Sequence, residues 1–493
     1  MPSTPQQIDF SQSFSPRQQP TYGTIPNTVW TSKGAGMTNL YEESRPEGLY
    51  AVRRSGLDYL QNDGGFSQFA QGGGWSLDII NRTQPFIVFG GTTPAMYASA
   101  GVSAPLTGPT FSYRDWYTVT GAIPGGLYTG IMTSLQGMWG ISNSGAGPSA
   151  SYIAGAPNNK CLGVAFLDGT TYIMSYNDNQ IHGSALQDPT TWPALNIIGA
   201  STSWGPGTTV SRHLNYILGF YRLGLQVYYD AGLAPPGSPL APLPNASFLV
   251  GCVTPASVVS MADTTIFVGL TAANNFSVYQ LSGLSLTIIS DPAVDSILKD
   301  YQLAITTIPG ARPICTAFSY TDKGHVIYAL KIEGVICLIY DTSTQKWNRL
   351  TTKTAGVVVP FTGSCGQYGM IGTVNGEVQQ WNQLSQVDTI AGGVTQPINC
   401  VVETTIMDFR SAYKKFVHKF SCYGDTIPST MTVEYSDDDY TTYSAAIPID
   451  LSKQRKMVNR QGSFYNRSYR FVYEGTSPFR MRAFELLLEG GTT

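Results

Sequence analysis

Charged side chains are scarce in this chain of 493 residues, at 12% against about 25% in an average soluble protein. The 29 Lys and Arg residues face 32 Asp and Glu residues, which gives a net charge of −3. Strong binding to DNA by counterion release needs a dense positive field, so this composition argues against it. A surface so poor in charge suggests that other subunits cover much of it.

Metal and redox cysteine motifs are missing as well. None of the seven cysteines forms a C-x-x-C pair, their number is odd, and most lie inside apolar, strand-like runs. We expect buried free thiols in a protein made in a reducing compartment. No stretch approaches 18 uninterrupted apolar residues, so no membrane span is expected. The N-terminus, MPSTPQQIDFSQSF, has no signal-peptide pattern, so we expect no Sec-type export.

Catalytic motifs are also absent. The four histidines lie far apart at positions 182, 213, 325 and 418, and neither H-E-x-x-H, G-x-S-x-G nor G-x-x-x-x-G-K-[ST] occurs. We therefore predict no enzyme, and we assign no catalytic residue, no cofactor and no metal ligand. The segments 319–325 (SYTDKGH) and 436–443 (SDDDYTTY) faintly resemble the Asp box of sialidase-type propellers, but we interpret both as exposed turns. The carboxylates at 437–439 could hold calcium, although a solvated turn is favoured.

What the sequence does contain is a succession of short strands and tight turns, typical of β-propeller blades. The turn Asp168-Gly169 is expected to join strands at Leu162–Phe166 and Thr171–Tyr176. A third strand is predicted at 180–185 and a further hairpin over 216–229. In LQDPTTWP, Trp192 is expected to be buried between blades.

Later hairpins repeat the pattern. One turns at Glu333-Gly334 and leaves its second strand through Tyr340-Asp341, a polar loop and Trp347, as in kelch-type blades, where the Trp packs between blades. Another has Asn375-Gly376, the strongest hairpin turn of the chain. Repeats of roughly 40–50 residues allow six or seven blades. Between them, SDPAVDSILKDY predicts a short amphipathic helix, N-capped by Asp291 and with Pro292 in its first turn.

We therefore predict an all-β protein with three parts. Residues 1–44, rich in Gln, Ser, Thr and Pro, form an extended N-terminal arm; residues 45–390 form a β-propeller; residues 391–493, with longer alternating strands, form an antiparallel β-sandwich. The last part holds the one local positive cluster, which could contact nucleic acid or an acidic partner ring, or be a solvated face. The cluster consists of Lys453, Arg455, Lys456, Arg460, Arg467 and Arg470.

Several landmarks follow one another in a characteristic order: an LYAVRRSGL strand, the exit SALQDPTTWP, the hairpin NYILGFYRLGLQVYY, the helix DPAVDSILKDY, YALKIEGVICLIYDTSTQKW, and a close on RMRAFELLLEGG. In this order the chain resembles the tail hub, or nozzle, proteins of short-tailed bacteriophages (podoviruses), also called packaged-DNA stabilisation proteins. The resemblance covers most of residues 160–490 and, more loosely, the N-terminal arm. Residues 62–150 depart from it most.

The resemblance implies a non-enzymatic virion protein, assembled in the host cytoplasm. It implies a homo-hexameric ring below the portal and adaptor, which continues the DNA channel, retains packaged DNA until ejection and mounts tail spikes, fibres or a needle. Double-stranded DNA would pass through the lumen without specific binding, which suits the low charge. The alternative is a propeller-type receptor-binding tail protein that binds or cleaves glycans, for which a pair of carboxylates in the propeller funnel would be the sign.

Overall fold

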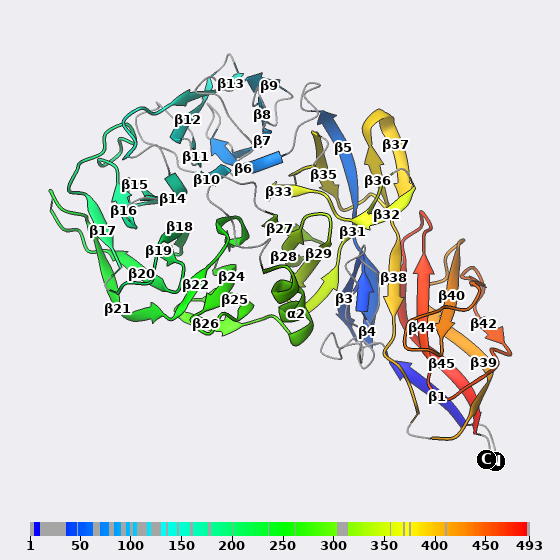
Figure 1. Cartoon of the computed structure of the whole chain (residues 1–493). Helices are drawn as coiled ribbons and strands as arrows, with labels where there is room; N and C mark the ends of the chain where they lie inside the picture. Colours follow the sequence, from blue (N-terminus) through cyan, green and yellow to red (C-terminus); the bar gives the residue numbers. More distant parts are fainter. Residues whose placement is uncertain are drawn as a thin grey trace.

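The computed structural model describes most of the chain. The described residues are 4–9, 36–46, 48–62, 70–77, 83–89, 95–98, 102–105, 116–119, 130–134, 137–144, 147–157, 161–175, 179–200, 202–234, 236–261, 263–302, 314–354, 356–367, 370–373, 376–409 and 412–490. Strands dominate them and form a ring of sheets beside a second, two-layered body (Figure 1). The all-β prediction of a propeller followed by a sandwich is confirmed.

The first half of the ring is built from four four-stranded antiparallel sheets. They consist of β6 (Ala70–Leu77), β7 (Thr83–Phe89), β8 (Ala95–Ala98) and β9 (Val102–Pro105); β10 (Trp116–Val119), β11 (Gly130–Ser134), β12 (Gly137–Ser144) and β13 (Gly147–Tyr152); β14 (Cys161–Leu167), β15 (Thr170–Ser175), β16 (Gln180–Gly183) and β17 (Ile197–Gly199); and β18 (Gly207–His213), β19 (Tyr216–Tyr221), β20 (Leu225–Asp230) and β21 (Leu240–Phe248). The described residues within 62–150, where the resemblance is weakest, thus contribute blades of the same design.

Three further units complete the ring. They consist of β22 (Val250–Cys252), β23 (Val259–Ser260), β24 (Thr264–Thr271), β25 (Phe276–Ser282) and β26 (Ser285–Ile288); β27 (Cys315–Asp322), β28 (His325–Ile332), β29 (Ile336–Asp341) and β30 (Lys346–Arg349); and β33 (Ser364–Gln367), β34 (Met370–Gly372), β35 (Glu377–Asn382) and β5 (Gly56–Asn62). The described residues therefore trace seven blade-like units, where the sequence predicts six or seven.

Strand β5 belongs to the last blade although it comes from near the N-terminus. It pairs antiparallel with β35, with Trp381 opposite Leu57, and forms the outer edge of that sheet. On the inner side, β33 of the last blade contacts β6 of the first. Closing a ring of sheets in this way leaves no gap between the first blade and the last.

Tight turns shape the hairpins within the blades. Asp168 and Gly169 have φ angles of 49° and 89°, as a type I′ turn between β14 and β15 requires. Gly376 has a φ of 77° before β35, while Asn375 lies outside the described residues. Both glycine positions are in the left-handed region that side chains with a Cβ disfavour.

Large apolar side chains seal the space between blades. Trp347 is buried, donates from Nε1 to the carbonyl of Ile289 at 2.8 Å, and packs on Tyr340 with ring centroids 5.1 Å apart. It belongs to a core shared by the sheets of β24–β25 and β28–β29. Trp192 packs against the core between β12 and β14, but it is only half-buried, so the expected full burial is wrong. Its indole N–H bonds locally to the carbonyl of Pro189 at 2.9 Å, which holds one edge of the ring at the surface.

The predicted helix forms as α2 (Pro292–Asp300). The carboxylate of Asp291 accepts the backbone N–H of Val294 at 2.9 Å and so caps the first turn. Val294 and Leu298 are buried in the core that holds Trp347, and α2 therefore braces two blades. None of the helices in the described part of the chain is long and apolar enough to span a membrane.

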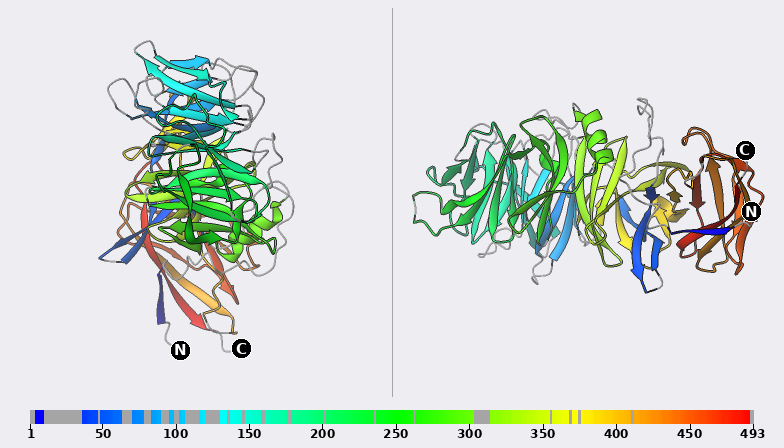
Figure 2. Two further views of the ribbon diagram at one scale, coloured as in Figure 1. Left: turned by 90° about the vertical axis from the view of Figure 1, so that its left-hand side faces the viewer. Right: turned by 90° about the horizontal axis from the view of Figure 1, so that it is seen from below.

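The second body, which we call the C-terminal sandwich, has two antiparallel layers (Figure 2). One layer has the order β3 (Leu40–Arg45), β4 (Gly48–Arg53), β45 (Arg480–Gly490), β39 (Lys415–Gly424) and β42 (Lys456–Asn459), with β1 (Thr4–Asp9) on β45 and β43 (Ser463–Phe464) on β39. The other has the order β2 (Gly36–Thr38), β38 (Cys400–Glu403), β44 (Ser468–Tyr473), β40 (Thr430–Ser436) and β41 (Ile447–Asp450). Buried side chains of both layers, such as Phe420, Phe471 and Phe484, form the core between them.

The N-terminal segment takes part in both bodies, and here the predicted boundaries need correction. The boundary at 44/45 falls inside the β3–β4 hairpin, and LYAVRRSGL opens on a sandwich strand because β4 pairs with β45. Residues 4–9 of the predicted arm also pair with β45, Thr4 lying opposite Leu488. The boundary at 390/391 falls between β36 (Val387–Ile390) and β37 (Val394–Pro397), which pair with each other.

One sheet joins the two bodies. The outer blade strand β30 pairs in parallel with β2 at Thr38 and Arg349, and β2 pairs antiparallel with β38, so nine strands run from blade to sandwich. A small hairpin of β31 (Thr351–Thr354) and β32 (Val357–Pro360) follows β30. The six cysteines with described side chains are all buried and free, as expected; the side chain of Cys365 lies outside that description.

We expect Trp347→Ala to destabilise the protein by roughly 3–5 kcal/mol, because it opens a cavity between two blades and removes a buried hydrogen bond. The half-buried Trp192→Ala should cost clearly less. Urea unfolding followed by tyrosine and tryptophan fluorescence measures both changes. Equal losses in the two variants would contradict the proposed role of Trp347 as an inter-blade seal.

Candidate interaction site at the propeller–sandwich junction

A buried ion pair lies where the last blade, the sandwich and the N-terminal segment meet. Arg54 and Asp388 are 0% and 5% exposed, and two parallel bonds of 2.9 and 2.6 Å join them. The guanidinium also lies over the ring of Trp381, 5.4 Å from its centroid. Burial opposes the positive charge, but Asp388 outweighs it and raises the pKa of Arg54. The guanidinium therefore stays charged, and its two bonds to Asp388 fix the geometry of the junction.

Asn39 extends this network to two further segments. Its Oδ1 accepts Nε of Arg54 at 3.2 Å, and its Nδ2 donates to Thr351 Oγ1 and to the carbonyl of Asn399, both at 2.7 Å. The φ angle of Asn39 is 59°, a left-handed conformation that asparagine tolerates better than most residues. The amide thus links the loop between β2 and β3 to both the blade and the sandwich.

The adjacent Ser55 ties the N-terminal segment to the β27–β28 hairpin. Its hydroxyl donates to Asp322 Oδ1 at 2.5 Å, and its backbone N–H donates to Oδ2 at 2.9 Å. Asp322 is 0% exposed, so the interpretation of residues 319–325 as a simple exposed turn is wrong for this residue. Lys323 and Gly324, at φ 50° and 88°, form the turn itself.

Arg53 is buried on the opposite side of the strand with neutral partners. Its Nη1 donates to the carbonyl of Gly475 at 2.6 Å, and its Nη2 donates to Gln386 Oε1 at 2.7 Å. Its carbonyl accepts Nζ of Lys323 at 2.8 Å. Burial lowers the pKa of Arg53, since a charged group loses its hydration there.

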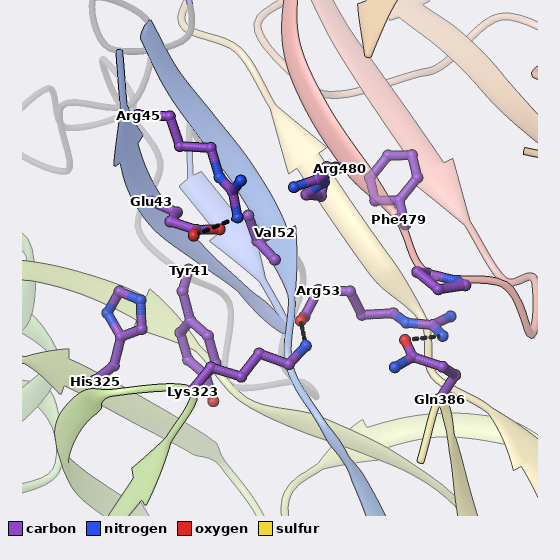
Figure 3. Close-up of a pocket in the computed structure, with 11 residues that line it drawn as sticks. Tyr41, Glu43, Arg45, Val52, Arg53, Lys323, His325, Gln386, Phe479 and Arg480 are labelled. Atoms are coloured by element: carbon purple, nitrogen blue, oxygen red, sulfur yellow. Dashed lines mark hydrogen bonds and ion pairs between the residues drawn. The ribbon is translucent and has the colours of Figure 1, made fainter. Parts of the chain in front are cut away.

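These residues border a pocket of about 360 Å³ between the β3–β4 hairpin, the turn at Lys323 and the start of β45 (Figure 3). We call it the junction pocket. Its ionisable wall carries Glu43, Arg45, Arg53, Lys323, His325 and Arg480, and its apolar wall carries Tyr41, Val52, Pro478 and Phe479. Positive charge exceeds negative charge on this lining.

His325 stands on the propeller side of the pocket. Its Nδ1 is 2.7 Å from Asp341 Oδ2, and its ring stacks on Tyr41 with centroids 5.4 Å apart. The hydrogen bond to Asp341 raises the pKa of His325, helped by the nearby carboxylates of Asp322 and Glu43. Asp341, one of the blade landmarks, thus orients the imidazole and favours its protonated form.

The junction can hold an anion and pack an aromatic or aliphatic group, but its hydrogen bonds do not resemble those of a catalytic triad. Among the described residues, His325 bonds to Asp341 and not to a serine or cysteine. Within the described residues, no group of three or more His, Cys, Asp or Glu is placed to hold a metal.

The predicted positive cluster of the sandwich does not form one exposed patch. Arg467 is 1% exposed and pairs with Asp437, Nε lying 2.6 Å from Oδ1. Arg470 pairs with Glu434, and the buried Lys456 donates to the carbonyl of Gly424 at 3.2 Å. These three side chains are engaged within the sandwich. Lys453, Arg455 and Arg460 are exposed, and a partner contact stays a prediction for them.

The acidic triplet is engaged as well. Asp437 holds Arg467, while Asp438 accepts bonds from Ser436 and Thr442, the latter at 2.6 Å from Oγ1. The hydrogen bonds from Thr442 lower the pKa of Asp438 to about 2. The solvated-turn interpretation fits this arrangement better than a calcium site does.

The residues of the junction were not predicted as a site from the sequence; they are Arg53, Arg54, Asp322, Lys323 and Asp388. One signal was present: two arginines interrupt an otherwise apolar strand pattern in LYAVRRSGL. A buried charge of this kind needs a partner, but the partner lies more than 300 positions away, at Asp388.

Comparison with known proteins agrees with the fold. Residues 132–364, just under half of the chain, match the family described as Phage_stabilise, Bacteriophage P22 Gp10, beta-propeller. The resemblance to phage tail hub proteins is confirmed over this segment. The matched segment begins in the second blade and ends in the last blade. The match supports a structural protein of a phage tail, hence a virion component.

No protein of curated function matches the sequence. Among solved structures, the chain is similar to an exo-beta-1,3-galactanase from Phanerochaete chrysosporium, with 9% identity, 85% of this chain and 100% of that chain covered, and a TM-score of 0.27. It is also similar to the dihydro-heme d1 dehydrogenase NirN (10% identity, 80% of each chain, TM-score 0.36). The SapL1 lectin gives 11% identity over 58% of this chain and 97% of that chain, with a TM-score of 0.31. Likenesses this distant carry no functional argument.

Replacing Arg54 by Met should cost roughly 3–5 kcal/mol, because it leaves the Asp388 carboxylate buried without its counter-ion. The double variant Arg54→Met, Asp388→Leu should recover a large part of that loss. A double-mutant cycle measures this coupling, with urea unfolding of the wild type, both single variants and the double variant. Removing the exposed pair of Arg45 and Glu43 by Arg45→Gln is the control and should cost less than about 1 kcal/mol. A double variant as unstable as the sum of the singles would refute coupling.

The His325 pair should make stability depend on pH. Because folding raises the pKa of His325, its contribution is complete below the unfolded value of about 6.5 and is lost as the pH rises through the higher folded value. The free energy of unfolding of the wild type should therefore fall more steeply above pH 6.5 than that of His325→Gln.

The wild type must be compared with His325→Gln because another group also makes the free energy of unfolding depend on pH. Burial raises the pKa of Glu403 to about 7, which gives a slope of the same sign in both proteins. His418→Gln, at the exposed pair with Glu489, is the matched control. Urea midpoints at several pH values measure the slopes. Identical slopes for wild type and His325→Gln would show that the pair contributes nothing.

Proposed function

We propose that the chain is the tail hub, or nozzle, of a short-tailed phage. Six copies form a ring below the portal and adaptor, continue the DNA channel, help retain the packaged genome until ejection and mount tail spikes, fibres or a needle. The observation that carries the proposal is the family match over residues 132–364, which comprise most of the propeller.

The way the two bodies are joined supports a role in transmitting force along the tail. A nine-stranded sheet runs from a blade into the sandwich, and the ion pair of Arg54 and Asp388 lies buried beside it. Additional ion pairs cross the same junction, including Lys346 to Glu42 at 2.5 Å. A subunit whose bodies are fastened by strands and buried charges transmits force without bending at a linker.

The charge distribution fits a DNA conduit better than a DNA-binding protein. The net charge is −3, and three of the six cations predicted as a cluster are engaged inside the sandwich. Each phosphate that a lumen neutralised would add affinity and hinder passage of the genome. Lys453, Arg455 and Arg460, which stay exposed, are proposed to contact an acidic neighbouring subunit or ring.

The mass of the protein, measured alone and with the portal–adaptor complex, tests the proposal. We expect six copies per connector in native mass spectrometry, with a heterologous, ring-closing contact between subunits. A chain that stays monomeric when the connector is present, and that cleaves or binds host polysaccharide, would refute the hub and favour the receptor-binding alternative. A heat-denatured sample is the control for non-specific adsorption to the connector.

A further inference from the structure

The junction pocket contains more positive charge than its own carboxylates neutralise. Two of its four arginine and lysine side chains have ion-pair partners: Arg45 with Glu43 at 2.7 Å, and Arg480 with Asp425 at 2.6 Å. The other two, Arg53 and Lys323, bond within the described structure to backbone carbonyls and an amide oxygen. Within the described part of the chain, these two cations have no ion-pair partner.

Of the two cations, Arg53 gives the stronger evidence that the pocket accepts an anion, because this residue is only 1% exposed. Its Nη atoms reach Gly475 and Gln386, while Nε is buried and has no acceptor among the described atoms. A buried cation without an anion is costly, and an unmet donor adds to that cost. Of the described carboxylates nearby, Asp388 is bonded to Arg54 and Asp322 accepts bonds from Ser55, and neither forms an ion pair with Arg53.

Lys323 supplies the second cation at the mouth of the pocket. It lies in the turn between β27 and β28, and its ammonium donates to the carbonyl of Arg53 at 2.8 Å. An ammonium has three donors, so this bond leaves others for a ligand. Figure 3 shows Lys323 reaching toward Arg53 from the propeller side, with Phe479, just before β45, and Gln386, just before β36, on the other side of Arg53.

The size and walls of the pocket narrow the choice of ligand. About 360 Å³ accommodates one or two side chains, and Tyr41, Val52 and Phe479 offer apolar contact next to the cations. Duplex DNA presents its phosphates along a wide helix and needs an extended basic surface, which a concave site with these two cations does not provide. A single carboxylate can accept a charge-assisted hydrogen bond from the ammonium of Lys323 and compensate the charge of the nearby Arg53 guanidinium.

We propose that the junction pocket is a receptor for an acidic peptide segment, with a glutamate or aspartate carboxylate entering between Arg53 and Lys323 and the neighbouring part of the peptide packing on Tyr41 and Phe479. The segment comes from a second copy of this chain or from another protein of the assembly. The carboxylate supplies the charge that the pocket lacks. This inference does not depend on ring formation.

Binding of a blocked, fluorescein-labelled hexaglutamate peptide to the full chain, followed by anisotropy at low salt, tests the inference. We expect saturable binding that blocked hexaglutamine does not show. Lys323→Asn, which suits the left-handed conformation at this position, should weaken binding by about fivefold or more, as expected for loss of a charge-assisted hydrogen bond. Lys299→Gln, which removes an exposed lysine at the end of α2, is the matched control and should bind like the wild type.

Arg53→Gln should weaken binding at least as much, and its circular dichroism spectrum reports whether it folds. If Arg53→Gln does not fold, the binding of Lys323→Asn alone tests the proposal, because Lys323 is exposed on a turn and its replacement should not prevent folding. Equal binding by wild type and Lys323→Asn, or equal weakening in Lys299→Gln, would overturn the proposal. So would competition by a 12-bp DNA duplex as effective as that by unlabelled hexaglutamate.

The same peptide identifies the source of the segment. If the chain self-associates and the peptide disrupts this association, the segment comes from a second copy of the chain. If a strictly monomeric chain binds the peptide, the segment comes from a different protein.

Discussion

The buried pairing of Arg54 with Asp388 is the constraint on which the arrangement of the two bodies depends. At this point the N-terminal segment, the hairpin after the last blade and the sandwich come together, and the backbone N–H of Leu57 also donates to Asp388 at 3.1 Å. In a dry environment either charge alone would be severely destabilising, so neither partner can leave independently. The ion pair therefore contributes positional accuracy to an interface that apolar packing alone would specify less sharply.

Around this ion pair, strands from the N-terminal part of the chain join the propeller to the sandwich. Residues 36–62 contribute in turn to the nine-stranded sheet, to the other sandwich layer and to the outer edge of the last blade. Backbone hydrogen bonds thus cross from one body to the other at several places. The propeller and the sandwich are distinct in their cores, yet they share strands, and they behave as one mechanical unit.

Local signals predicted the local structure well. Asp168-Gly169 indicated a hairpin, Asp291-Pro292 indicated the start of α2, and alternating strands indicated the sandwich, because each depends on neighbours in the sequence. The pairing of β2, β4 and β5 with strands more than 300 positions away has no such signal, so the predicted arm and its boundary were wrong in part. For the same reason, the junction pocket could not be predicted, and Asp322 was taken for an exposed turn residue.

The position of β5 also has a consequence for synthesis of the protein. The ribosome makes β5 early, but its partner β35 (Glu377–Asn382) emerges only after six other blade-like units have been made. Until then, the last blade lacks its outer strand and β5 has an unpaired edge, the kind of edge that recruits strands from other chains. The chain can complete its propeller only after β35 has been made, so a chain truncated before β35 cannot close the ring of sheets.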